Sequence, residues 1–157
     1  MSGESTGERG VQLCRSALQR VIAHAESAYP QECFGFLLGH FGKRCIRVAR
    51  PGRNVNTSRA HDRYEMDAHE FLQAQAEAEK WGGEIMGFYH SHPDDLAIPS
   101  AYDRERAWEE YLYLIVPVAG GRAESARLWQ LQGPEGVFSE IPLQLIGAKG
   151  SGQGALG

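Results

Sequence analysis

Three side chains in this 157-residue sequence have the types and spacing to hold a metal ion, namely His90, His92 and Asp103. The apolar run that ends at Tyr89 predicts a buried strand. If the extended conformation continues through His92, both imidazoles point to one face, because side chains alternate along a strand. Pro99-Ser100 predicts a helix that begins with Ser100 as its N-cap and carries Asp103 in its first turn. A strand end, a short loop and a helix start could therefore bring two imidazoles and a carboxylate to one point.

Two histidine nitrogens and one carboxylate oxygen are suitable protein ligands for a catalytic zinc site, which leaves its fourth position to water. A second interpretation of the same residues is structural. Ser100 and Asp103 have a spacing close to that of a helix capping box, and a His-x-His pair on a strand is often a surface feature. The residues alone do not decide between a metal site and a capped helix beside two histidines.

The complete pattern resembles the signature of the JAMM zinc metallopeptidases, also called the MPN-plus or JAB domain family. His90-Ser91-His92-Pro93, then six residues, then Ser100-x-x-Asp103 match the family signature in order and spacing. The family also has a glutamate near the end of its first helix, followed by an apolar strand, and Glu32 with the segment 33–39 matches this part. The resemblance covers about residues 11–142. The short connection after Asp103 is similar to that of the compact, stand-alone members found in prokaryotes.

This resemblance implies a fold and a chemistry. The family's domains have a curved, partly closed sheet between helices, akin to the cytidine-deaminase-like architecture. His90, His92 and Asp103 would hold one zinc ion per chain. Glu32 would hold the attacking water and act as base and then acid, while Ser100 would stabilise the oxyanion. The implied reaction is hydrolysis of an amide bond at the C-terminus of a ubiquitin-like or sulfur-carrier protein. The residue types do not prove zinc, since the same ligands bind several divalent metals.

The sequence leaves one rival function open and argues against two others. A non-catalytic MPN-type binding module for ubiquitin-like partners would share the fold, although a degraded metal motif is expected there. A zinc deaminase needs His-x-Glu and Pro-Cys-x-x-Cys, and the sequence has neither. A cysteine hydrolase at Cys33 would need a histidine beside the thiol, and nothing in the sequence favours that pairing. Considered without the resemblance, Glu32 is better explained as a surface turn residue that follows Pro30.

Periodicity and turn signals predict helices and strands in alternation around the central strand. The predicted helices are 11–28, 68–80 with Asp67 as its cap, and 100–110. The predicted strands are 33–41, 44–49, 85–92, 111–118, 126–131 and 137–142, with a further short one at 64–66. This order predicts a single-domain α/β protein with a mixed sheet and helices on its faces. We predict a disordered N-terminus at residues 1–10, the metallopeptidase domain at 11–146 and a flexible glycine-rich tail at 147–157.

Composition argues against nucleic-acid and membrane partners. The net charge is −4 without a long basic run, and no apolar stretch reaches the length of about 18 residues that a membrane span needs. The polar N-terminus resembles neither a signal peptide nor a transit sequence. Three cysteines without a Cys-x-x-Cys spacing predict reduced thiols in a cytoplasmic protein. The sequence does not fix the oligomeric state.

Residues around the motif have predicted supporting or structural roles. Ser91 is expected to face the other side of its strand and to support the site from there. Glu84, Asp94 and Asp95 are expected to be solvated, unless one of them orients a ligand histidine. Trp129 is expected to pack against the core. The polar segment 50–61 is equally consistent with a solvated loop and with part of a substrate groove.

Overall fold

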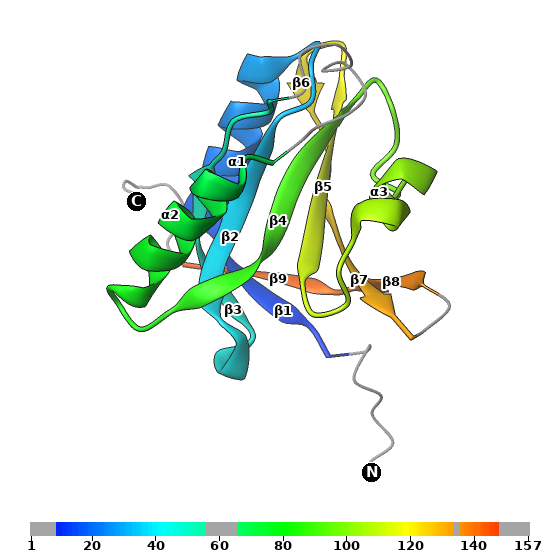
Figure 1. Ribbon diagram of the computed structural model, residues 1–157. Helices are drawn as coiled ribbons and strands as arrows, with labels where there is room; N and C mark the ends of the chain where they lie inside the picture. Colours follow the sequence, from blue (N-terminus) through cyan, green and yellow to red (C-terminus); the bar gives the residue numbers. More distant parts are fainter. Residues whose placement is uncertain (1–8, 56–65, 134–135, 148–157) are drawn as a thin grey trace.

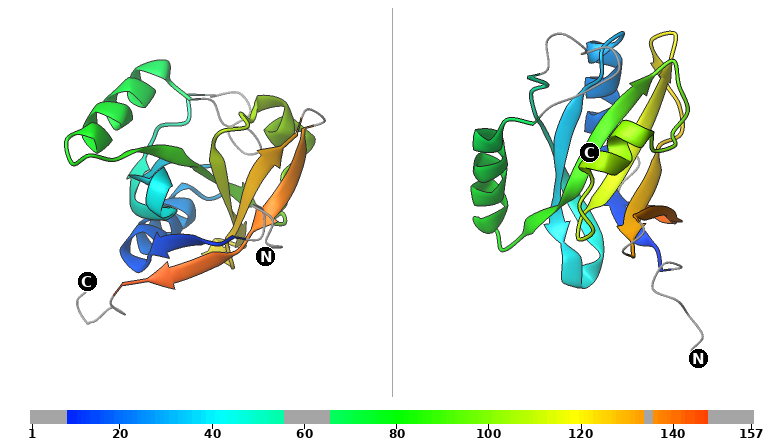
Figure 2. Two further views of the ribbon diagram at one scale, coloured as in Figure 1. Left: turned by 90° about the horizontal axis from the view of Figure 1, so that it is seen from below. Right: turned by 45° about the vertical axis from the view of Figure 1, so that its right-hand side comes forward.

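A curled, mixed β-sheet with helices on both faces forms the body of the protein in the computed structural model (Figures 1 and 2). The structure describes residues 9–55, 66–133 and 136–147. The helices are α1 (Arg15–Ala28), α2 (Ala68–Glu79) and α3 (Ala101–Arg106). The strands are β1 (Val11–Cys14), β2 (Phe34–His40), β3 (Cys45–Pro51), β4 (Glu84–Pro93), β5 (Leu112–Ala119), β6 (Arg122–Ala123), β7 (Arg127–Gln132), β8 (Val137–Ile141) and β9 (Leu143–Ile146). Within the described residues they form one sheet in the order β8-β7-β5-β4-β2-β3-β1-β9, with β6 paired to β5.

The predicted α/β class, a curved mixed sheet flanked by helices, is confirmed. The six longer predicted strands agree with the observed bounds to within two residues. Helix α2 is capped as predicted, because the Asp67 side chain accepts a hydrogen bond from the backbone N–H of His69 at 3.0 Å. The predictions for residues 1–8, 148–157 and most of the short strand at 64–66 fall outside the described residues. None of the described helices is long and apolar enough to cross a membrane.

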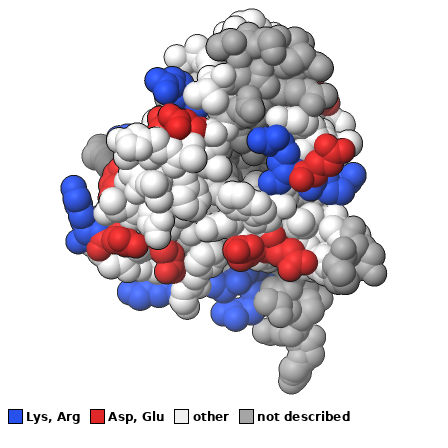
Figure 3. Space-filling model, viewed as in Figure 1, with Lys and Arg blue, Asp and Glu red and all other residues white. Residues whose placement is uncertain are grey.

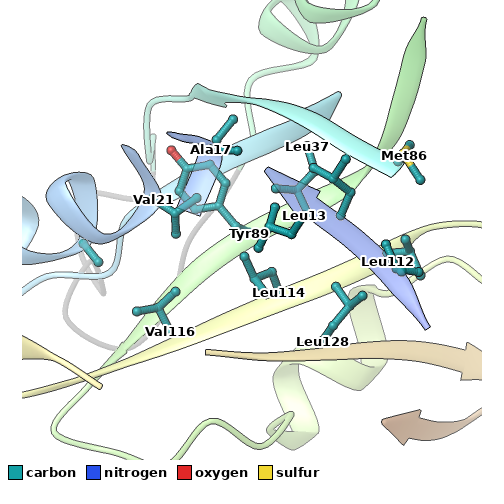
Figure 4. Close-up of a cluster of buried hydrophobic side chains, with 14 of the residues drawn as sticks. Leu13, Ala17, Val21, Leu37, Met86, Tyr89, Leu112, Leu114, Val116 and Leu128 are labelled. Carbon is teal, nitrogen blue, oxygen red and sulfur yellow. The ribbon is translucent and has the colours of Figure 1, made fainter. Parts of the chain in front are cut away.

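Alternation along the central strands divides the buried side chains into two groups, one on each face of the sheet. Leu37, Tyr89 and Leu114 belong to the cluster that packs against α1 (Figure 4). Phe36 and Phe88 project from the opposite face and pack beneath α2. Each fully buried side chain of this size contributes about 1.5–3 kcal/mol relative to an exposed one. The two clusters therefore hold β2, β4 and β5 from both sides.

Strand β4 lies between β2 and β5 and carries the two histidines of the motif. It runs antiparallel to β2, with Phe34 opposite His90, and parallel to β5, with His92 opposite Pro117. Both neighbours keep β4 extended, so His90 and His92 project from the same face as Phe88. Helix α3 lies over this face (Figure 2).

The chain begins with a strand and then a helix, which corrects the single helix predicted for residues 11–28. Val11–Cys14 forms β1 and pairs in parallel with both β3 and β9, which buries Val11 and Leu13. Strand β9 was not predicted. Pro142 separates it from β8, and the Pro142 carbonyl accepts a hydrogen bond from the Val11 N–H at 2.9 Å. The segment from β8 to β9 thus joins the two ends of the strand order and closes the curl of the sheet.

Helix α3 ends at Arg106, four residues before the predicted end at position 110. Ala107 is extended, with ψ of 150°. Trp108 then packs edge to face on Phe88, with ring centroids 6.1 Å apart, and its backbone N–H donates to the Tyr113 hydroxyl at 2.7 Å. The contacts of Trp108 with the sheet therefore replace a further helical turn.

Candidate metal centre

His90, His92 and Asp103 come together on the face of β4 that α3 covers. The Nε2 atoms of the two histidines lie 3.3 Å apart. Asp103 Oδ2 lies 3.0 Å from His92 Nε2 and 3.3 Å from His90 Nε2. All three residues are at least nine-tenths buried. The strand end and the helix start predicted from the sequence thus bring three donor atoms to one point.

The triangle of donor atoms has the size that a tetrahedral metal ion requires. Ligand bonds of about 2.0–2.2 Å separate two tetrahedral ligands by about 3.3–3.6 Å. The observed separations of 3.0–3.3 Å are close to that range. Two imidazole nitrogens and a carboxylate oxygen also suit zinc and several other divalent metals. The residues present therefore fit a divalent metal ion.

Backbone groups orient two of the three donors. His92 Nδ1 lies 2.7 Å from the carbonyl oxygen of Leu96. Because a carbonyl only accepts, we assign the ring proton to Nδ1, which leaves the lone pair of Nε2 facing the triangle. Asp103 Oδ2 accepts a hydrogen bond from the Ser100 N–H at 2.9 Å. A backbone carbonyl has no signature in the sequence, so the partner of His92 could not have been predicted.

The electrostatics of the triangle favour an ionised aspartate. Burial alone would raise the pKa of Asp103, but His90 and the hydrogen bonds from His90, His92 and Ser100 hold this pKa well below its usual range. Burial alone would lower the pKa of His92, but the hydrogen bond and charge of Asp103 outweigh it and raise the pKa overall. The ionised Asp103 carboxylate therefore stabilises a positive charge next to it, and it would stabilise a bound metal cation in the same way.

Glu32 lies just before β2, beside the metal triangle. Since Phe34 is opposite His90 in the antiparallel ladder, the register two residues earlier places Glu32 across from His92 and on the same face. Glu32 is only 7% exposed, which rules out the exposed turn residue considered above. Its charge contributes to the raised pKa of His92. Glu32 is not one of the three residues whose donor atoms form the triangle.

Ser100 caps α3 and borders the triangle at the same time. Its Oγ accepts a hydrogen bond from the Asp103 N–H at 3.0 Å, and together with the Ser100 N–H to Asp103 contact this completes a capping box. The same Asp103 Oδ2 faces both histidines. The structural interpretation and the metal interpretation of Ser-x-x-Asp are therefore compatible. Ser100 itself is exposed, and its hydroxyl hydrogen is not used by the cap.

The back of β4 anchors the residue next to Glu32. Ser91 is fully buried, its Oγ accepts a hydrogen bond from the Cys33 N–H at 2.8 Å, and its own N–H donates to the Cys33 carbonyl at 3.3 Å. Burial raises the pKa of the Cys33 thiol to about 11. The thiol therefore stays protonated near neutral pH, which argues against a cysteine nucleophile at this position.

Asp94 is exposed, as expected, and its carboxylate accepts hydrogen bonds from the Tyr29 hydroxyl at 2.6 Å and from the Gly120 N–H at 2.9 Å rather than from a ligand histidine. The prediction for Trp129 is wrong. Trp129 is half-buried and donates from Nε1 to the Ala97 carbonyl at 3.0 Å, so it packs on the loop before α3 and not in the core. Of the segment 50–61, residues 50–51 end β3, while 56–61 lie outside the described residues and the groove prediction stays a prediction.

Comparison with known proteins agrees with the geometry. The family model of prokaryotic homologs of the JAB domain matches residues 15–132. A desampylase of Haloferax volcanii is 37% identical over 108 residues, which are 66% of this chain and 77% of that protein. The deubiquitinase BRCC36 of Camponotus floridanus is 28% identical over 152 residues, which are 87% of this chain and 60% of that protein.

A solved structure agrees as well. A protein of Desulfitobacterium hafniense has a TM-score of 0.74 and 27% identity to this chain, with 87% of this chain and 92% of that chain covered. The matched segment of the family model includes the triangle, Glu32 and Ser100. The resemblance drawn from the motif is therefore confirmed, and the chain belongs to the family of prokaryotic homologs of the JAB domain.

Proposed function

We propose that this protein is a zinc-dependent isopeptidase that hydrolyses an amide bond at the C-terminus of a ubiquitin-like or sulfur-carrier protein. The observation that carries the proposal is the buried triangle of His90 Nε2, His92 Nε2 and Asp103 Oδ2, with separations of 3.0–3.3 Å. The substrate class is supported by two relatives, one named a desampylase and the other a deubiquitinase. The three cysteines are free thiols, which supports a reducing compartment such as the cytoplasm.

The triangle would hold one zinc ion per chain. When bound, the metal supplies Lewis acidity, which polarises the scissile carbonyl and makes a water molecule nucleophilic near neutral pH. The Leu96 carbonyl keeps His92 Nε2 directed at the site, and the Ser100 N–H does the same for Asp103 Oδ2. These contacts spare the ligands the entropy cost of being ordered when the metal binds.

Glu32 moves the protons in this proposal. Its carboxylate accepts a proton from the attacking water and then delivers one to the departing nitrogen, because an unprotonated amine is a poor leaving group. Its burial and its register position across from His92 support this role.

Ser100 stabilises the negative charge that develops on the carbonyl oxygen. The oxygen of its hydroxyl accepts from the Asp103 N–H, so the hydroxyl hydrogen can donate to the substrate. A hydrogen bond to a developing oxyanion strengthens as the transition state forms, which is why it accelerates the reaction.

Metal content and cleavage, measured on the same preparations, test the proposal. We expect about one zinc ion per chain by elemental analysis and cleavage of a ubiquitin-like fusion at its C-terminal amide. Asp103→Ala should lose both, whereas Glu32→Gln should keep the zinc and lose cleavage. Glu79→Gln, a charge-neutralising change on the exposed surface of α2, is the matched control and should behave as wild type. Zinc-loaded protein that binds a ubiquitin-like partner without cleaving it would overturn the proposal in favour of a binding module.

A further inference from the structure

An aromatic pocket of about 270 Å³ lies on the face of the sheet that carries the metal triangle. Phe34, Phe88 and Tyr113 line it from the sheet, Trp108 lines it from the segment after α3, and Glu105 and Arg106 are its charged lining residues. In Figure 3 the surface between α2 and α3 is mostly uncharged, and charged side chains gather where Figure 1 places α3.

The pocket lies near the metal centre, because the same elements build both. Phe34 is directly opposite His90, and Phe88 precedes His90 by two residues on the same face of β4. Tyr113 is opposite Phe88 in the parallel ladder. Helix α3 carries the metal ligand Asp103 near its start and reaches the pocket with its last residues.

The interior of the pocket is suited to an apolar group. Phe34 and Phe88 are almost fully buried, and their rings stack with centroids 6.0 Å apart. The Tyr113 hydroxyl accepts the hydrogen bond from the Trp108 N–H, which ties the Tyr113 ring to the segment after α3. Trp108 is 47% exposed although its ring touches Phe88. A half-exposed tryptophan beside an aromatic pocket is a common feature of surfaces that bind apolar side chains.

The position of Glu32 indicates which side of the substrate reaches the pocket. A residue that protonates the departing nitrogen must lie on the leaving side of the scissile bond. Glu32 is level with His92 and Phe34 with His90, whereas Phe88 lies two residues beyond His90 on the side away from His92. The acyl side of the substrate therefore runs toward Phe88. An extended chain advances about 3.3 Å per residue, so two residues cover about the separation of His90 and Phe88 along β4.

We propose that this pocket binds a large apolar side chain of the substrate, located two residues upstream of the residue that supplies the scissile carbonyl. The proposal rests on the proposed isopeptidase function and narrows its substrate class. For a tail that ends in Gly-Gly, the selected residue is the one just before the two glycines. The preferred substrates are then tails with leucine, phenylalanine or another large apolar residue at that position.

The experiment compares tails of the form X-Gly-Gly joined through an amide to aminomethylcoumarin, with X as alanine, leucine, phenylalanine or aspartate. We expect kcat/KM of the zinc-loaded protein to rise about tenfold to a hundredfold from alanine to phenylalanine, the range that burial of one large apolar side chain supports. Trp108→Ala should reduce this ratio to within about threefold. Trp81→Ala is the matched control, because Trp81 is similarly exposed, at 40%, and lies outside the pocket lining.

A second readout uses no turnover. The peptide Phe-Gly-Gly, titrated into metal-free protein and followed by heteronuclear NMR, should shift the Trp108 indole signal and leave that of Trp81 unchanged. Equal kcat/KM for alanine and phenylalanine tails, with cleavage intact, would overturn the pocket and leave the isopeptidase function standing. Absence of cleavage of every tail by zinc-loaded protein would overturn the function, and the subsite with it.

Discussion

The two faces of β4 carry polar side chains for different purposes. On the front, His90 and His92 face each other and Asp103, so their polar atoms meet at one point in space. On the back, Ser91 Oγ accepts from the Cys33 N–H, and the Tyr89 hydroxyl lies 2.7 Å from His24 Nδ1. The front groups converge on one another, as a metal site requires, whereas the back groups are hydrogen-bonded to neighbouring elements of the fold. Changes on the front should therefore affect chemistry first, and changes on the back should affect stability first.

The largest effect is expected from removing a front histidine. His92→Ala takes away one donor of the triangle and should lower kcat/KM at least about 1,000-fold, because the metal supplies several kcal/mol of transition-state stabilisation. The rise in melting temperature that zinc gives to the wild type should also disappear, since ligand binding stabilises only the state that binds. Calorimetry with and without zinc measures this. A zinc-dependent stabilisation as large as that of the wild type would contradict the assigned ligand.

A smaller loss of activity is expected at Ser100, where two roles can be separated. Ser100→Ala should lower kcat about 100- to 1,000-fold through the missing donor and should cost about 1 kcal/mol through the missing cap. Ser100→Gly lacks the same hydroxyl, but glycine caps helices with a loss of only a few tenths of a kcal/mol. Steady-state kinetics and urea unfolding of both variants should therefore show similar kcat and different stabilities. Recovery of kcat in Ser100→Gly would contradict the donor role.

A substitution on the back face of β4 should lower stability and leave metal binding unchanged. Ser91→Ala leaves the buried Cys33 N–H without its acceptor and should cost about 1–3 kcal/mol of unfolding free energy, with zinc content unchanged. Denaturant unfolding and elemental analysis measure the two quantities. Ser125→Ala, in an exposed loop, is the control and should change neither. If Ser91→Ala lost zinc while keeping the stability of the wild type, Ser91 would support the metal site and not the fold.

The smallest effect on activity is expected from alkylating reagents, because the Cys33 thiol behind β4 should react slowly. Burial raises the pKa of Cys33 to about 11 from an ordinary value of 9.0, so at pH 8 its thiolate fraction is about a hundredfold lower than that of an ordinary thiol. Iodoacetamide should modify the half-buried Cys14 first and Cys33 far more slowly, with cleavage activity retained. Mass spectrometry of time points tests this order. Rapid labelling of Cys33 with loss of cleavage would revive a cysteine mechanism.

The sequence was most informative where the determining contacts are local. The alternation of His90 and His92 and the three-residue step from Ser100 to Asp103 each lie within one element, so strand and helix periodicity predicted their directions. Pairing between distant segments could not be predicted in the same way. Val11 and Leu13 fit both a helix and a strand, and the strand formed because β3 and β9 flank it. The early end of α3 likewise depends on Trp108 reaching Phe88 on another element.

Contacts to backbone atoms were the second kind of information missing from the sequence. His92 is oriented by the Leu96 carbonyl, and Trp129 donates to the Ala97 carbonyl. Every residue has a carbonyl, so residue types could not single out these two. The burial of Glu32 was implied only by the family resemblance, because Pro-Gln-Glu considered by itself is typical of an exposed turn.

Helix α3 would connect the two proposed binding events, because it carries the proposed metal ligand Asp103 and reaches the aromatic pocket within six residues. If metal binding orders this helix, it also orders part of the pocket wall. Thermodynamic linkage then requires the effect to be reciprocal, so a bound tail must tighten the hold on the metal by the same factor. A chelator should therefore remove the metal more readily from the free enzyme than from the enzyme with a bound substrate tail.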